Sequence, residues 1–339
     1  MPAPTRPTMA DVARVAGVSP TTVSHALNDK GRVDPETRAH VRKIAGELGY
    51  APSRAARSLA LGRADTIGVL LPSFAAMPVE DLLETDWYGR IAVGASQSAL
   101  HHRRALALLP GDETPDSLQR FGLEGLIILD PFTDDPRCAA AHRAGLPFVL
   151  LGYDARHPDA RRVAPDTQGG MRVLLEHLAD AGARSVALVA TDLDWSAGRD
   201  ALAAYRRWCG DTGRPERIAV ANLIGCRSRD EAATAARHAA HQLLTDADRP
   251  DAIIGLFEDF GRGITAAARD LDLAVPEDVM VAQDVDGIKA QLNHPPITAL
   301  DLHPTSQVAA AVELLLNPHP DHTTVTTPTT LRVRASSTR

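Results

Sequence analysis

A set of hydrogen-bonding side chains stands near the start of the sequence, in the stretch GVSPTTVSHALN at positions 17–28. Helical spacing places hydroxyl, imidazole and amide groups on one face of this stretch and apolar residues on the other. The polar groups belong to Thr21, Thr22, Ser24, His25 and Asn28, and the apolar ones to Val23, Ala26 and Leu27. Such a face suits recognition by hydrogen bonds. The sequence contains no H-E-x-x-H, G-x-S-x-G or P-loop motif for hydrolytic or phosphate chemistry.

Capping residues predict three short helices that position this polar face. Thr8 can cap the first helix, Ser19 followed by Pro20 begins the second, and Asp34 followed by Pro35 begins the third. The inward-facing apolar residues are Met9, Val12, Ala13 and Ala16, then Val23, Ala26 and Leu27, then Val41, Ile44, Ala45 and Leu48. A unit of this size buries little surface, so its exposed polar face requires a function.

Charge is distributed unevenly along the 339 residues. Residues 1–63 carry ten Lys and Arg against five Asp and Glu, whereas the remaining 276 carry 26 against 38. The front segment is therefore positive and the rest negative, within a net charge of -7. Contacts to phosphate supply most non-specific affinity for nucleic acid, so a basic front segment favours DNA binding; a solvated charged face is the alternative.

The segment from Thr8 to Ala60 resembles the DNA-binding headpiece and hinge of the lac-repressor (LacI) family of bacterial transcription regulators. The similarity runs without a gap and includes the order A-x-x-A-G-V-S-x-x-T-V-S-x-x-L-N. It implies a homodimer that binds a pseudo-palindromic double-stranded DNA operator and more often represses than activates. It also implies a bacterial protein whose operator affinity is modulated by a small-molecule effector.

In a helix-turn-helix the second helix lies in the major groove and its N-terminal residues meet base edges. We therefore predict base contacts from Thr21 and His25, with Pro20 contacting a thymine methyl group. Many relatives carry Arg where His25 stands, so the guanine preference here should be weaker; a solvated histidine is the alternative. The predicted phosphate contacts come from Thr8, Ser19, Thr22, Ser24 and Asn28.

The stretch YAPSRAARSLALGR at positions 50–63 resembles the family's hinge helix. Pro52 would begin it, and Arg54, Ala56, Arg57 and Leu59 are the predicted minor-groove residues. In relatives the equivalent leucine enters the minor groove from both subunits and kinks the duplex. The alternative is a helix whose leucine packs on the following domain.

Near-continuous apolar runs alternate with helical patterns from residue 66 onward, which is typical of parallel strands covered on both faces. The expected fold is an all-α helix-turn-helix headpiece plus an α/β effector domain of two doubly wound parallel-sheet lobes. The resemblance implies that this domain is similar to periplasmic binding proteins, with ligand in the cleft. The expected boundaries are 1–50 for the headpiece, 51–63 for the hinge and 64–339 for the effector domain, with an N-lobe at about 64–165 and 290–322 and a C-lobe at about 166–289 and 323–339.

The effector domain departs from the family pattern where ligand would bind. Several acidic, amide and arginine positions that suit sugar hydroxyls are replaced, which argues against a common monosaccharide as effector. Surface or packing roles are the alternative for each cleft candidate. These candidates are Ser73, Asp166, Trp195, Arg199, Glu258, Asp259 and Asp284.

An enzyme is the rival hypothesis. The stretch GRGITA, Gly261–Ala266, fits the G-x-G-x-x-A pattern of nicotinamide-dependent, NAD(P)-linked oxidoreductases. Three residues separate it from the preceding apolar run, and only 73 residues follow it, so we expect no catalytic residues and no cofactor. Three widely spaced cysteines predict no metal site, and the absence of a leader or an apolar span predicts a cytoplasmic protein without membrane contact.

Overall fold

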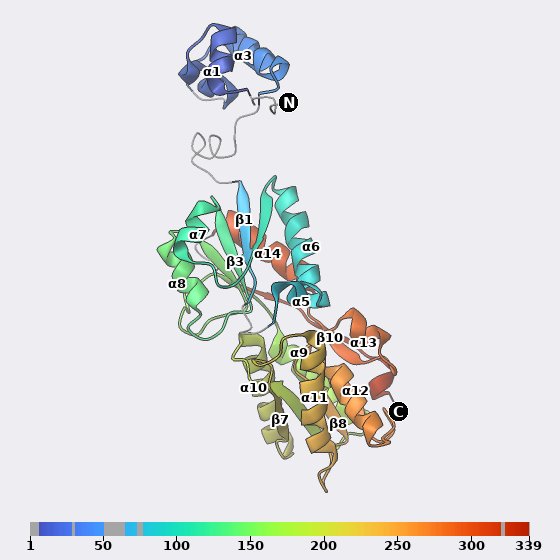
Figure 1. The fold of residues 1–339 in the computed structure, drawn as a ribbon. Helices are drawn as coiled ribbons and strands as arrows, with labels where there is room; N and C mark the ends of the chain where they lie inside the picture. The colour runs from blue at the N-terminus through green and yellow to red at the C-terminus, as the bar shows by residue number, and fades with distance from the viewer. Residues whose placement is uncertain (1–6, 29–30, 51–64, 73–76, 320–322, 339) are drawn as a thin grey trace. The chain divides into compact units, whose positions relative to one another are not determined.

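The computed structural model describes residues 7–28, 31–50, 65–72, 77–319 and 323–338. The chain divides into two compact units, residues 1–65 and 66–339, which we call the headpiece and the body (Figure 1). No helix in the described ranges combines the length and hydropathy that a membrane crossing requires.

The headpiece consists of helices α1 (Met9–Ala16), α2 (Pro20–Leu27) and α3 (Pro35–Glu47). The predicted caps are confirmed: the Ser19 hydroxyl accepts the backbone N–H of Thr22 at 3.1 Å, and the Asp34 carboxylate accepts that of Thr37 at 2.8 Å. Side chains from all three helices form the core, and its buried members are Val12, Ala13, Ala16, Val23, Ala26, Val41 and Ala45.

The body contains two six-stranded sheets, one in each lobe. The N-lobe sheet has the order β11-β5-β4-β3-β1-β2, and all its pairs are parallel. Its strands are β1 (Thr66–Leu70), β2 (Ala105–Leu109), β3 (Gly125–Leu129), β4 (Phe148–Leu151), β5 (Arg162–Pro165) and β11 (Thr324–Thr327).

The C-lobe sheet has the order β12-β10-β9-β8-β6-β7. Its strands are β6 (Val186–Thr191), β7 (Ile218–Ala221), β8 (Ala252–Gly255), β9 (Met280–Gln283), β10 (Thr298–Asp301) and β12 (Thr330–Arg332). The expected parallel arrangement holds for five of these strands. The edge strand β12 runs antiparallel to β10.

Helices cover the sheets of the body, as Figure 1 shows. In the N-lobe, the apolar residues of α6 (Asp86–His101) and α14 (Pro304–Leu316) belong to a different core cluster from those of α7 (Pro115–Arg120) and α8 (Pro136–Arg143). In the C-lobe, the apolar residues of α11 and α12 likewise belong to one core cluster, and those of α9 and α10 belong to another. The C-lobe helices are α9 (Thr167–Asp180), α10 (Ser196–Thr212), α11 (Arg229–Leu244) and α12 (Phe260–Asp270), and the shorter helices are α5 (Val79–Leu83), α13 (Ile288–Leu292) and the 3-10 turn η1 (Ala335–Ser337).

The chain passes between the lobes three times: from β5 to α9, from β10 to α14 and from β11 to β12. Two of the expected lobe boundaries therefore need correction. Strand β10 lies in the C-lobe sheet, although residues 290–322 were assigned to the N-lobe, and β11 lies in the N-lobe sheet, although residues 323–339 were assigned to the C-lobe. These strands are only four residues long, and their hydropathy does not show which sheet each one joins.

Candidate nucleic-acid interface and ligand cleft

The predicted base-contacting residues lie together on the outer face of α2. Pro20 and Thr21 are exposed at the first turn, and His25 follows one helical turn later, half-buried. The imidazole packs over Gly31, where an added Cβ atom would lie 2.6 Å from His25 Nδ1. The first turn of α2 therefore exposes the Thr21 side chain, and close packing against Gly31 restricts the His25 ring.

The predicted phosphate-contacting residues surround the same helix, and several also hold the headpiece together. The Thr8 hydroxyl donates to the Asp11 carboxylate at 2.7 Å, and Ser19 and Thr22 share a hydroxyl contact at 2.9 Å. The Asn28 side-chain amide donates to the Ser24 carbonyl oxygen at 2.9 Å, which leaves the second amide hydrogen of Asn28 for another acceptor. Thr8 and Ser19 stand at helix N-termini, where free backbone N–H groups favour phosphate.

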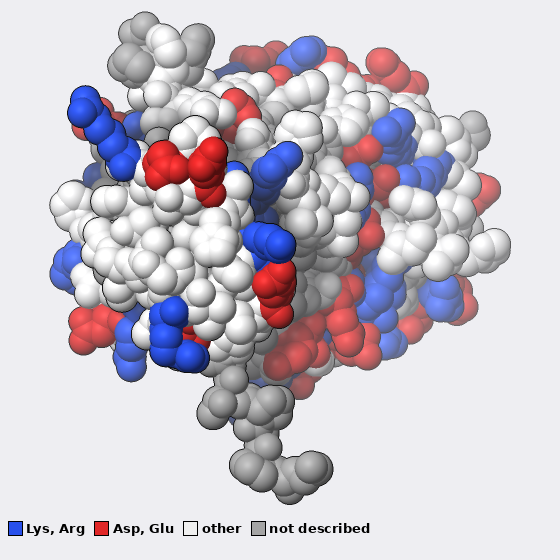
Figure 2. Space-filling model, turned by 90° about the horizontal axis from the view of Figure 1, so that it is seen from above, with Lys and Arg blue, Asp and Glu red and all other residues white. Residues whose placement is uncertain are grey.

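Basic side chains in the described headpiece come mainly from α1, α3 and the loop between α2 and α3. They belong to Arg14, Arg32, Arg38, Arg42 and Lys43. On the face drawn in Figure 2, blue and red side chains are interspersed. The predicted hinge residues Arg54, Ala56, Arg57 and Leu59 lie outside the described residues, and so does Ser73 of the cleft set.

Two small adjoining cavities, of about 50 and 20 Å³, lie where the lobes of the body meet. Trp87 and Asp130 from the N-lobe line both of them, together with Ala197 and Leu302. Strand ends from both sheets supply the polar groups, as expected for a ligand site in an α/β fold.

The structure brings three of the predicted cleft residues together. Trp195, Glu258 and Asp284 line the larger cavity. The others lie outside the lining: Arg199 forms an ion pair with Asp194 at 2.8 Å, and exposed Asp166 caps α9 by accepting the Gly169 backbone N–H. Buried Asp259 is surrounded by cations and forms ion pairs with Arg229, Arg262 and Lys289.

The two units match two known protein-family models. Residues 8–53 match the model described as bacterial regulatory proteins, lacI family, and residues 175–337 match the periplasmic binding protein-like domain. The chain belongs to the LacI family. It is therefore a DNA-binding transcriptional regulator, and the α2 face lies inside the segment that defines the family.

Curated relatives cover nearly the whole LacI-family chain. It is 29% identical over 320 residues to the HTH-type transcriptional regulator CelR of Thermobifida fusca, with 92% of this chain and 91% of CelR covered. It is 27% identical to the ribose operon repressor of Escherichia coli K12 over 320 residues, which cover 91% of this chain and 92% of the repressor.

Solved structures of LacI-family proteins have the same fold. A CelR–cellobiose complex superposes with a TM-score of 0.70 at 25% identity, covering 98% of this chain and 100% of CelR. A lac repressor dimer bound to operator and the anti-inducer ONPF gives a TM-score of 0.78 at 22% identity, covering 98% and 99% of the two chains.

Glu258 joins the two lobes of this LacI-family body. Its carboxylate accepts the backbone N–H groups of Asp86 and Trp87 at 2.9 and 3.0 Å, at the start of α6 in the opposite lobe. Arg229 binds the same carboxylate at 3.0 Å and donates to the carbonyl oxygen of Glu84. Burial raises the pKa of Glu258, although these donors favour its charged form. The carboxylate therefore bridges the lobes in the conformation described.

Sequence reasoning missed most of the cavity wall, including Trp87, Tyr88, Asp130 and Phe257. The Tyr88 hydroxyl and the Trp87 indole N–H donate to the Asp130 carboxylate at 2.6 and 3.4 Å. Burial raises the pKa of Asp130. Asp130 directly follows strand β3, a position at the carboxyl edge of the sheet that could have suggested a ligand role. The aromatic residues carry no such local signal.

The glycines of GRGITA, on which the oxidoreductase hypothesis rests, lie inside α12 instead of in a strand-to-helix turn. An added Cβ atom at Gly261 would lie 2.4 Å from Gln283 Oε1, and one at Gly263 would lie 2.2 Å from the Ala233 carbonyl oxygen. Both glycines thus allow close packing of α12 against its neighbours. Their place in the fold does not fit a diphosphate-binding turn.

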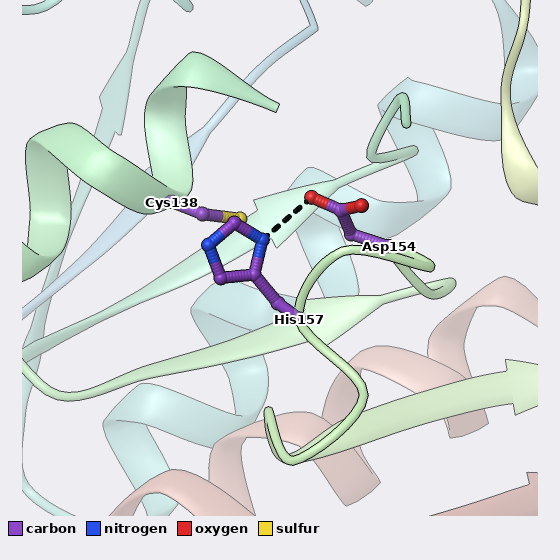
Figure 3. Close-up of side chains that lie close together, drawn as sticks. All are labelled: Cys138, Asp154 and His157. Carbon is purple, nitrogen blue, oxygen red and sulfur yellow. Dashed lines mark hydrogen bonds and ion pairs between the residues drawn. The ribbon is translucent and has the colours of Figure 1, made fainter. Parts of the chain in front are cut away.

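Cys138, Asp154 and His157 place their ligand atoms within 4.8 Å of one another, a grouping that the cysteine spacing did not predict (Figure 3). Burial raises the pKa of Cys138 to about 12, so the thiol stays protonated. Asp154 uses both carboxylate oxygens within the protein, where they bind the backbone N–H groups of Asp134, Asp135 and Arg156 and the Nδ1 atom of His157. The hydrogen bonds explain this cluster as a support for the 131–135 loop.

Proposed function

We propose that the protein represses transcription as a homodimer on a pseudo-palindromic operator, and that a small molecule in the cleft of the body changes its operator affinity. The observation that carries this proposal is the outer face of α2. Thr21 in the first turn and His25 in the last turn stand one turn apart there, on the helix that enters the major groove in a helix-turn-helix. Because operator DNA lies in the bacterial cytoplasm, this function places the protein there.

Exposed apolar side chains on one side of the body support the homodimer. Val93 and Leu100 on α6 are 58% and 72% exposed, and Ile288 and Leu292 on α13 are 50% and 77% exposed. Val93 and Ile288 line the same groove, and Figure 1 shows α6 and α13 along the same side of the body. An apolar patch that spans both lobes fits a two-fold interface, and a two-fold protein requires a two-fold DNA site.

The cleft supports modulation by an effector. Hydrogen bonds join the lobes around it, among them those of Glu258 with α6 and of the Tyr153 hydroxyl with Asp200. A ligand that enters between the lobes would change these contacts and with them the lobe angle. The larger cavity, of about 50 Å³, is small for an organic ligand. Entry of an effector therefore requires the lobes to separate, and coupling to DNA is typically about 1–3 kcal/mol.

Selection of duplexes from a random pool by the full-length protein tests the DNA-binding part of this proposal. We expect enrichment of one sequence with two inverted half-sites. Enrichment of a single unrepeated half-site would contradict the homodimer model, and a pool without an enriched sequence would contradict operator binding itself.

The proposed interface has a test of its own. Leu292→Asp combined with Val93→Asp places charges in the apolar patch, so we expect a monomer in sedimentation velocity and a loss of operator affinity. Val220→Asp is the matched control, because Val220 is 59% exposed on the edge strand β7, far along the chain from the patch. Dimers that persist in the double variant would place the interface elsewhere.

A further inference from the structure

Asp284 has a buried carboxylate oxygen with no partner in the described part of the chain. The residue follows strand β9, lines the larger cavity and is 7% exposed, and its Oδ1 atom receives no hydrogen bond. Burial raises the pKa of Asp284 to about 7. An unpaired carboxylate in such a place costs several kcal/mol, so a binding partner would remove an existing penalty.

A second carboxylate reaches the cavity from the opposite lobe. Asp130 receives hydrogen bonds from Tyr88 and Trp87 but forms no ion pair among the described residues. No Lys, Arg or His appears among the described residues that line either cavity. The nearby cations are already paired: Arg137 binds Asp135 at 2.7 Å, and Arg229 binds both Asp259 and Glu258, the third carboxylate of the wall.

Aromatic rings form much of the remaining wall. They are the side chains of Trp87, Tyr88, Trp195 and Phe257. Trp195 and Phe257 stack with ring centroids 5.8 Å apart and an interplanar angle of 17°. The faces of aromatic rings carry negative electrostatic potential, and tryptophan attracts cations most strongly. The aromatic rings and the carboxylates of the wall therefore both attract a positively charged ligand.

The polar groups of the wall also disfavour neutral and anionic ligands. The Tyr88 hydroxyl and the Trp87 indole N–H already donate to Asp130, and the Thr85 hydroxyl donates to the Leu82 carbonyl oxygen. A sugar needs donors as well as acceptors, and an anion needs cations or free N–H groups. This wall supplies acceptors and ring faces.

We propose that the effector is an organic cation, an ammonium group attached to a small apolar body. This inference rests on the proposed function, because it identifies the chemical class of ligand for the same cleft. Asp284 would receive the ammonium group directly. Trp195 and Phe257 would contact its apolar body, and Asp130 would supply a second negative charge from the N-lobe.

Ligands that share one carbon skeleton provide the test. Isobutylammonium chloride, isobutanol and sodium isobutyrate are titrated into the full-length protein, with cellobiose as a sugar probe, and tryptophan fluorescence is followed. Trp87 and Trp195 line the cavity, whereas Trp208, on α10, packs against Arg214. We expect saturable quenching by the ammonium compound, with about tenfold or greater preference over the alcohol.

Asp284→Asn keeps the shape of the side chain and removes its charge, so we expect it to weaken ammonium binding by about tenfold or more. Asp166→Asn is the matched control, since exposed Asp166 lies outside the cavity lining and asparagine also caps helices well. Equal or tighter binding of the alcohol, the carboxylate or cellobiose would overturn the inference, and so would ammonium binding that Asp284→Asn leaves unchanged.

Operator binding is measured on the same samples. If the protein selects an operator but the ammonium compound does not bind, the ligand class is wrong and the proposed function stands. If the ammonium compound binds in an Asp284-dependent way while no duplex is selected, the ligand class stands and the proposed function fails.

Discussion

The headpiece and the body build their recognition surfaces in different ways. The headpiece displays Pro20, Thr21 and His25 on one eight-residue helix, packed on a small core that has seven buried residues among those described. The cleft of the body gathers side chains from Thr85 to Leu302, carried by strand ends and loops of two sheets. A surface on one helix can be specified by a local motif. A cleft between lobes depends on packing across the entire domain, so its chemistry can change while the fold persists.

The headpiece and the body have separate hydrophobic cores. Among the substitutions proposed here, we expect Val23→Asp to have the largest effect on DNA affinity. Val23 is fully buried in the headpiece, so a carboxylate there should unfold the three helices and lower DNA affinity by about a hundredfold or more. The thermal transition of the body should stay unchanged in calorimetry. Val15→Asp is the control, because Val15 is 45% exposed on α1. A shifted body transition would show that the two units fold together.

Gly263→Ala makes the reciprocal change in the body. The new methyl group would lie 2.2 Å from the Ala233 carbonyl oxygen at the contact of α12 with α11, and overpacking of this kind typically costs about 1–3 kcal/mol. Chemical denaturation should show this loss, with affinity for random duplex DNA unchanged. Gly210→Ala is the matched control, since nothing lies within 4 Å of its Cβ position in α10, and it should stabilise by about 0.5–1 kcal/mol. A neutral result at Gly263 would mean that the helices separate easily.

The same contrast explains how far the sequence could be interpreted. Caps at Ser19 and Asp34 and the apolar strands were predictable, because short-range hydrogen bonds and hydropathy determine them. Strands β10 and β11 were assigned to the wrong lobes, since the choice of sheet depends on long-range pairing. Trp87 and Phe257 were missed as lining residues for a similar reason: nothing local marks the side of a helix or loop that will face a cleft.

The charge of Asp284 has a smaller effect, which depends on pH, on the stability of the body. Its pKa is raised from 3.8 in the unfolded reference to about 7, so between these values the folded state holds a proton that the unfolded state lacks. The free energy of unfolding therefore falls as the pH rises through this window, and the penalty is complete above it. Asp284→Asn lacks this penalty, so the melting temperature of the variant should rise relative to that of the wild type as the pH increases from about 4 to about 7.

Melting curves of both proteins at several pH values measure this gain, with Asp166→Asn as the control at an exposed carboxylate. A difference in melting temperature that stays constant across the window would show that Asp284 is already ionised and stabilised in the folded body.

The measurement that most directly tests the central claim is the ratio of affinities for the selected operator and a scrambled duplex of the same length and composition, at one moderate salt concentration. The outer face of α2 should supply the preference, so Thr21→Ala and His25→Ala should each reduce this ratio by about five- to tenfold, close to 1 kcal/mol. Their affinity for the scrambled duplex should match that of the wild-type protein. An unchanged ratio in both variants, or equal losses on both duplexes, would contradict the claim that α2 reads the bases.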